Sequence, residues 1–176
     1  MTKSYDPVTK ILHWLIFALI AAQYAVGEFM PHIGRKTEDA GLVALHMSLG
    51  ATVLVAIVID IAWRITHPVP PLPELPRWQR LFSVAVHWGL LGLVLLMTLL
   101  GWAATNSRGW PVPVLGLVPL PAIAPTGARW AHEAGDIHVF LVNVLLGLVI
   151  LHAGAALYHH FVLRDKVLKR MLPGDA

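Results

Sequence analysis

Four long apolar stretches, separated by polar or proline-rich segments, dominate the hydrophobic pattern of this chain. They cover about residues 8–29, 40–65, 80–103 and 131–163. A helix needs about 20 mostly apolar residues to cross the hydrocarbon part of a bilayer, so each stretch is long enough to span it. Backbone groups inside a bilayer must bond one another, which favours helices for such spans. The pattern predicts an all-α integral membrane four-helix bundle, with residues 1–176 forming a single membrane domain.

The segments between these stretches contain strong helix-breaking signals. Pro7 suits the first turn of the first helix. Residues 67–76 carry too many prolines for a helix and predict a stiff extended connector. Residues 105–129 also contain several prolines and predict a long loop, which at this length is more often functional than idle.

Composition agrees with a membrane protein and removes several other classes. Hydrophobic residues make up 57% of the chain and charged residues 13%, against about 25% charged in soluble domains. The absence of cysteine excludes disulfides, iron–sulfur clusters and covalently attached haem. The sequence pI is near 9.5, but the basic residues lie at the ends of the apolar stretches, as in membrane proteins. We therefore expect a bilayer as the surroundings and no nucleic-acid partner.

The distribution of lysine and arginine between the two sides predicts the orientation. One side collects nine of them: Lys3, Lys10, Arg64, Arg77, Arg80, Arg164, Lys166, Lys169 and Arg170. The other side has four: Arg35, Lys36, Arg108 and Arg129. Because the more basic side normally stays in the cytoplasm, both termini are expected there. The first stretch lacks a convincing cleavage site and is expected to remain as a span.

Two histidines of the fourth stretch share one face of the predicted helix. His138 and His152 are 14 residues apart, which amounts to about 1400°, about 40° short of four turns, and a rise of about 21 Å. An imidazole inside a bilayer is costly and usually has a partner or a function. The spacing suggests two metal or haem sites stacked across the membrane.

The predicted topology supplies each of these histidines with a counterpart. His46 is expected near the outer side with His138, and His13 in the inner half with His152. Two ligands per level are too few for a tetrahedral zinc site but match the two axial positions of a haem iron. His87 lies in the inner half of the third stretch, and the residues alone allow it to replace His13. Gly50, one turn after His46, is expected to leave room for a flat ligand.

Other histidines receive different interpretations. His159 follows His152 by seven residues, about 20° off its face, and with His87 it predicts a proton-exchanging ligand site beside the inner haem; interfacial packing is the alternative. His160 is expected at the membrane surface. Solvated loop positions are expected for His32, His67 and His132.

Several motifs carry a resemblance to a known family: Lys10-Ile-Leu-His13-Trp14, Leu45-His46-Met-Ser-Leu-Gly50, and His138 with His152-Ala-Gly-Ala-Ala-Leu-Tyr-His-His160. They resemble bacterial cytochrome b561, and the histidine plan is similar to that of the cytochrome b subunits of hydrogenases and formate dehydrogenases. The resemblance implies two haems b, held by His13, His46, His138 and His152. It also implies a bacterial inner-membrane oxidoreductase, of the superoxide oxidase type, that passes electrons from periplasmic superoxide to ubiquinone.

The electron donor is the least determined part of this interpretation. Local positive charge would guide an anion such as superoxide, and Arg108 and Arg129 are the residues expected to do so. Acidic residues share the same loops, however, so the outer side is not basic by net count: Glu38, Asp39, Glu133 and Asp136. Two alternatives stay open: an electron-transfer subunit served by a partner dehydrogenase or hydrogenase, and a histidine-lined membrane metal carrier.

Overall fold

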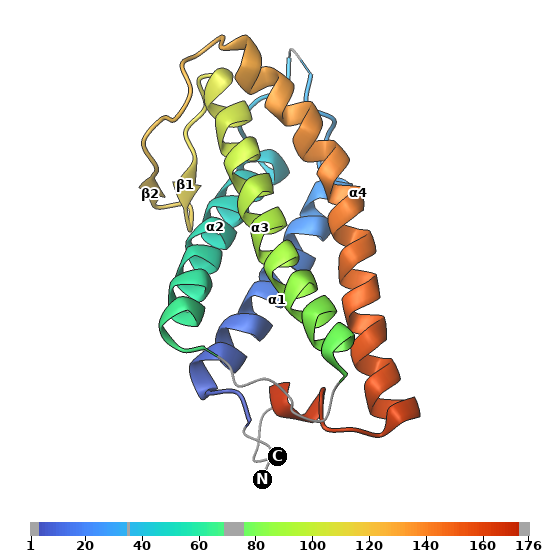
Figure 1. The fold of residues 1–176 in the computed structure, drawn as a ribbon. Helices are drawn as coiled ribbons and strands as arrows, with labels where there is room; N and C mark the ends of the chain where they lie inside the picture. The colour runs from blue at the N-terminus through green and yellow to red at the C-terminus, as the bar shows by residue number, and fades with distance from the viewer. Residues whose placement is uncertain (1–3, 35, 69–75, 173–176) are drawn as a thin grey trace.

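The computed structural model describes residues 4–34, 36–68 and 76–172. Its four long helices stand side by side (Figure 1): α1 (Pro7–Phe29), α2 (Leu42–Thr66), α3 (Arg77–Ser107) and α4 (Arg129–Tyr158). A π-helical turn, η1 (His159–Leu163), continues α4, and a 3₁₀ turn, η2 (Lys169–Met171), follows. All four helices are long and apolar enough to cross a membrane. The predicted integral membrane four-helix bundle is confirmed.

The helix ends differ from the expected spans by a few residues. α1 begins as predicted, with Pro7 at its start and the Asp6 carboxylate accepting the Thr9 N–H as an N-cap. α3 is longer than expected, because Pro76 caps its start and the helix continues to Ser107. Gly109, at φ 78°, then turns the chain away. Lys3, Arg35 and most of the proline-rich connector lie outside the described residues.

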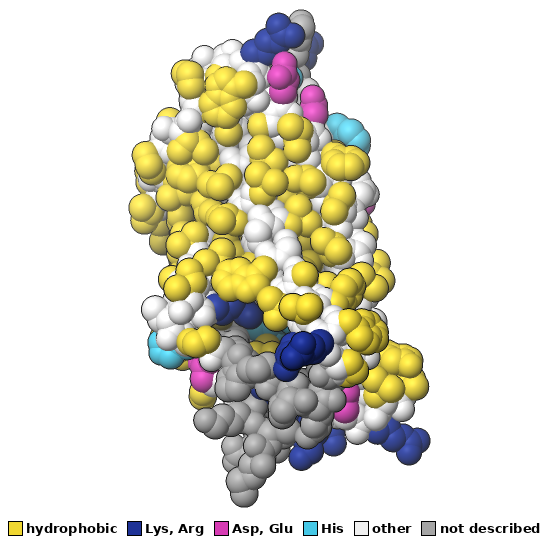
Figure 2. All heavy atoms as spheres, viewed as in Figure 1, with side chains coloured by type: hydrophobic (Ala, Val, Ile, Leu, Met, Phe, Trp, Pro, Cys, Tyr) yellow, Lys and Arg dark blue, Asp and Glu magenta, His cyan; other side chains and the backbone are white. Residues whose placement is uncertain are grey.

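Apolar side chains occupy both the core and the outer surface of the bundle. A buried cluster joins α1, α2 and α3 through Ile16, Val53, Leu54, Ala56, Ile57, Leu91 and Val94. Figure 2 shows hydrophobic side chains covering the middle of one face, with charged groups toward its ends. Exposed apolar residues include Phe17, Ile59 and Phe140. A soluble monomer rarely exposes so continuous an apolar surface, whereas a bilayer requires one.

The segment between α3 and α4 is more ordered than a simple loop. Two short strands, β1 (Pro113–Val114) and β2 (Val118–Pro119), pair in antiparallel register. The turn between them places Leu115 and Gly116 at φ 51° and 71°, the signs that a tight hairpin turn requires. The Leu115 N–H donates to Thr52 Oγ1 at 3.2 Å, so the hairpin folds back along α2 (Figure 1).

The two ends of the bundle are closed differently. At one, called here the terminal end, the C-terminal segment packs on the start of α1: Ser4 Oγ donates to the Arg170 carbonyl at 3.2 Å and Trp14 Nε1 to the Met171 carbonyl at 2.9 Å. The Arg170 guanidinium lies 4.9 Å from the Tyr5 ring centre. At the opposite end, called here the loop end, lie the α1–α2 loop and the segment that joins α3 to α4 (Figure 1).

Candidate functional site

Toward the loop end, His46 of α2 and His138 of α4 face each other. Their ring centres are 6.3 Å apart and the ring planes make an angle of 84°. His138 Nδ1 lies 2.8 Å from the Met97 carbonyl oxygen. That bond assigns the proton to Nδ1 and leaves the Nε2 lone pair free, the arrangement usual for a metal-bound imidazole. His46 Nδ1 is buried and has no hydrogen-bond partner among the described residues.

Glycines on the other two helices lie against these rings, and the one on α3 is the tighter of the two. A Cβ on Gly101 of α3 would lie 3.2 Å from Cε1 and Nδ1 of His138, and one on Gly27 of α1 would lie 3.5 Å from Cε1 of His46. Neither glycine was predicted from the sequence, because each lies on a different helix from the histidine that it approaches. At Gly50, a Cβ would meet the Gln23 amide nitrogen at 3.2 Å; that this glycine leaves room for a flat ligand stays a prediction. The space beside Gly50 therefore accommodates Gln23, which donates to the His46 carbonyl.

Toward the terminal end, three histidines from three helices form a cluster. The ring centres of His13 (α1) and His152 (α4) are 6.2 Å apart, with 63° between the planes. His87 of α3 lies closer to His152, at 5.1 Å and 82°, and its Nδ1 is 2.6 Å from the Ser83 carbonyl oxygen. Both histidines that were expected to compete for the inner haem thus contact His152.

The spacing within the two pairs can be compared with the size of a haem iron site. Two metal–imidazole bonds of about 2 Å, with about 1 Å from each nitrogen to its ring centre, put two axial imidazoles about 6 Å apart. His46–His138 and His13–His152, at 6.3 and 6.2 Å, match this separation. Among the described residues, no group of three or more metal-binding side chains is arranged to hold an ion. The separations within the two histidine pairs are what fit haem.

A buried ion pair lies near the three-histidine cluster. Arg64 Nε contacts Asp60 Oδ2 at 2.8 Å, within α2, and the two side chains are 15% and 1% exposed. The Arg64 guanidinium is close enough to act electrostatically on His13, His87 and His152. From the sequence, Arg64 was predicted only to help orient the protein in the membrane, and no role was predicted for Asp60. A carboxylate four residues before an arginine, inside an apolar stretch, was the signal available.

The remaining predicted histidines have other neighbours. His159 begins the π-helical turn, and its Nδ1 lies 2.5 Å from Asp165 Oδ2; π-helical turns often occur at functional sites. No ring contact joins His159 to His87 in the part of the chain that the structure describes. His132 lies in α4 and not in a loop, although it is exposed as expected. His67 stacks on Trp63, with ring centres 3.8 Å apart.

The two arginines expected to guide an anion differ in their contacts. Arg129 is 93% exposed and its Nε lies 3.2 Å from Glu133 Oε1, so a carboxylate offsets its charge. Arg108 donates from Nη1 to the Gly34 carbonyl at 3.0 Å and lies over the Trp110 ring at 5.3 Å. Neither contact neutralises its charge.

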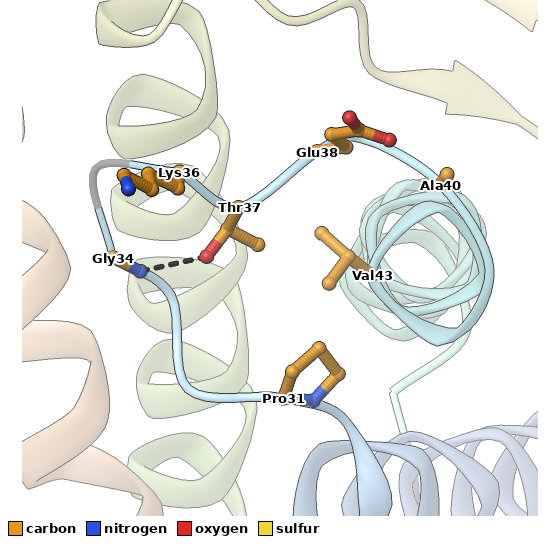
Figure 3. Close-up of a pocket in the computed structure, with 7 residues that line it drawn as sticks. All are labelled: Pro31, Gly34, Lys36, Thr37, Glu38, Ala40 and Val43. Atoms are coloured by element: carbon orange, nitrogen blue, oxygen red, sulfur yellow. Dashed lines mark hydrogen bonds between the residues drawn. The ribbon is translucent and has the colours of Figure 1, made fainter.

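Arg108 lies beside an open pocket at the loop end. Figure 3 shows its lining, which comes from the α1–α2 loop and the start of α2. The pocket has a volume of about 650 Å³ and is lined by Pro31, Gly34, Lys36, Thr37, Glu38, Ala40 and Val43. The Gly34 N–H donates to Thr37 Oγ1 at 2.8 Å, which shapes the loop. Val43 is one helical turn from His46, so the pocket approaches the His46–His138 pair.

Comparison with known proteins relates the whole chain to one group. The profile of a family described as "Prokaryotic cytochrome b561" matches residues 4–174. "Cytochrome b561 homolog 2" of Escherichia coli is 30% identical, over 96% of this chain and 90% of that protein. "Cytochrome b562" of Cereibacter sphaeroides is 34% identical, over 96% and 94%. "Probable superoxide oxidase CybB" of Yersinia pestis is 28% identical, over 98% of both chains.

Proposed function

This chain belongs to the prokaryotic cytochrome b561 family, and we propose that it carries electrons from periplasmic superoxide, through two bis-histidine haems b, to ubiquinone. Its family establishes haem b binding and membrane electron transfer, and with the four helices it establishes a multi-pass protein of the bacterial inner membrane. The donor, the haem count, the acceptor and the roles of individual residues are the proposal.

The observation that carries the proposal is the pair of imidazole separations. His46 and His138 would hold one haem, and His13 and His152 the other, since both pairs have the spacing that an iron with two axial imidazoles requires. The shorter 5.1 Å between His87 and His152 supports His13 as the ligand. When bound, haem b accepts and releases one electron at a time. The protein's residues position and tune it.

The orientation assigns the two ends different tasks. Excess lysine and arginine at the terminal end puts that end, with both termini, in the cytoplasm. The His46–His138 pair then lies on the periplasmic side and the three-histidine cluster on the cytoplasmic side. Electrons would enter at the first and leave at the second.

The contacts at the loop end support an anionic donor. Superoxide gives up one electron and leaves as dioxygen, so the chain needs only to attract it. Among the described residues, Arg108 has no carboxylate paired with it, and it lies beside the pocket that approaches His46; such a charge raises the encounter rate of an anion. Arg129 contributes less because Glu133 is paired with it. We place the approach of the donor at this pocket.

Ubiquinone reduction requires protons as well as electrons. Two superoxide ions supply two electrons, and the quinone takes up two protons from the cytoplasmic side to form quinol. His87 and His159 would exchange these protons, because imidazole both holds and releases a proton near neutral pH. Asp165, 28% exposed and bonded to His159, would connect this route to water.

The test is a haem count followed by anaerobic reduction of the purified protein. Pyridine haemochrome analysis should give two haems b per chain. Superoxide should then reduce both haems, and added ubiquinone should reoxidise them. One haem per chain would contradict the two-pair scheme. Two haems that superoxide leaves oxidised would instead favour a partner dehydrogenase or hydrogenase as donor.

A further inference from the structure

The Asp60–Arg64 ion pair lies at the level of the terminal-end histidines. The buried core cluster joins Ile16 of α1, Ile57 of α2 and Leu91 of α3. One turn from each of these residues toward the terminal end come His13, Asp60 and His87. Arg64 follows one turn further along α2. The pair is thus packed into the same layer as the three-histidine cluster.

Burial strengthens the electrostatic interactions of these two charges, and removing them from water costs free energy. The Asp60 side chain is 1% exposed, and its Oδ1 atom is buried without a hydrogen-bond partner among the described residues. A buried ion pair is a poor source of stability, since desolvation offsets much of its attraction. Ionisable groups at membrane depth are therefore retained mainly for function. Low surrounding polarity also extends the reach of their field.

The pair presents its positive member to the histidines. Arg64 acts electrostatically on the rings of His13, His87 and His152. At the other site, the neighbours of the His46 and His138 rings include the Met97 carbonyl and two glycines, Gly27 and Gly101, none of which carries a charge. The terminal-end site thus differs from the loop-end site by a neighbouring ion pair, in which Asp60 is buried and Arg64 is partly buried.

A nearby cation stabilises the form of a site that has gained an electron. We propose that the Arg64 guanidinium, positioned by Asp60, raises the reduction potential of the terminal-end haem above that of the loop-end haem. The inference rests on the proposed function. With haem bound at both sites, an electron passing from the His46–His138 site, which would be oxidised, to the His13–His152 site, which would be reduced, would move in the energetically favourable direction. Arg64 and Asp60 act as positioning and tuning residues, without contacting the donor.

Potentiometric titration of the purified holoprotein, followed by the optical bands of each haem, tests this directly. Arg64→Gln leaves the negative charge of Asp60 without a partner and should lower the reduction potential of the terminal-end haem. Asp60→Asn leaves the positive charge of Arg64 without a partner and should raise that reduction potential. Each change should shift the equilibrium constant for sharing an electron between the haems at least tenfold, about 59 mV for one electron. The loop-end potential should change much less.

Controls separate the charge from loss of structure. Arg77→Gln removes a positive charge from an exposed position at the same end and should leave both potentials unchanged. Arg64→Lys keeps the charge and should keep the order of the two potentials. The double variant Asp60→Asn/Arg64→Gln removes both charges and leaves neither unpaired. Its potentials are measured instead if a single variant fails to assemble.

Two failures can be told apart. One haem per chain in the unaltered protein would overturn the proposed function itself. If two haems are present but their reduction potentials do not change in Arg64→Gln and Asp60→Asn, or change equally at both sites, only the tuning role would be overturned. Shifts of opposite sign at the terminal-end haem would support it.

Discussion

The loop-end pair and the terminal-end cluster use the same side chain in different surroundings. At the loop end, His46 and His138 lie against glycines, and His138 is bonded to a backbone carbonyl. At the terminal end, His87 joins His13 and His152, and the Asp60–Arg64 pair lies beside them. One site is set by close packing and neutral groups, the other by buried charge and an additional imidazole.

If both pairs hold haem as proposed, this difference shows how two chemically identical ligand pairs would serve opposite ends of an electron path. The glycines beside the loop-end rings add no charge, which would suit a site that only passes electrons on. Additional titratable groups at the terminal end suit a site that must couple electrons to protons. The following predictions test that contrast, from the largest effect to the smallest.

Removal of a ligand should abolish one haem and spare the other. His46→Ala or His138→Ala should lose the loop-end haem, and His13→Ala or His152→Ala the terminal-end haem, because one imidazole cannot supply both axial bonds. Haem content and reduced-minus-oxidised spectra measure this. A His87→Ala protein that lost a haem, beside a His13→Ala protein that kept both, would show that His87 is the ligand.

Loss of the proton-exchanging histidines should spare both haems and slow quinone reduction. His87→Ala and His159→Ala should retain haem reduction by the donor, but reoxidation by ubiquinone should fall by about 10²–10⁴-fold, the usual contribution of general acid–base catalysis. Rapid-mixing spectroscopy follows both steps. Unchanged reoxidation in both variants would remove these residues from the quinone site.

Filling the glycine space should affect only the loop-end site. Gly101→Ala brings a Cβ to 3.2 Å from the His138 ring, and disturbing the support of a ligand typically costs about 10–100-fold in metal affinity. Gly89→Ala is the matched control on the same helix, since nothing lies within 4 Å of its Cβ. Haem retention during dilution should fall for the first and not for the second. Equal retention would contradict close packing of His138.

Charge reversal at the loop end should distinguish the two arginines. Arg108→Glu should slow haem reduction by superoxide by about tenfold at low salt, the lower end of electrostatic steering. Arg129→Glu should slow it less, because Glu133 already offsets that charge. The difference should shrink as salt rises, since exposed charges are screened over about 8 Å at physiological ionic strength. Haem content, which should not change, is the control; equal effects of both variants would argue against Arg108 as the main guide.

Much of the fold follows from local pattern alone. Apolar runs of spanning length required four helices, because a bilayer leaves the backbone no other partner. The 14-residue interval put His138 and His152 on one face of α4, since helical periodicity is independent of the neighbours. Pro7 and Asp6 likewise determined where α1 begins.

What lies opposite each face depended on how the helices pack. Helical periodicity placed Gly50 on the same face as His46, but the side chain that lies beside Gly50 is Gln23. The glycines that lie against the histidine rings come from α1 and α3. His87 contacts His152 because α3 and α4 lie side by side. Asp60 became significant only when the structure showed it buried on α2 and paired with Arg64. A sequence encodes which residues share a helix face, whereas the distances between helices are decided by the packing of all of them together.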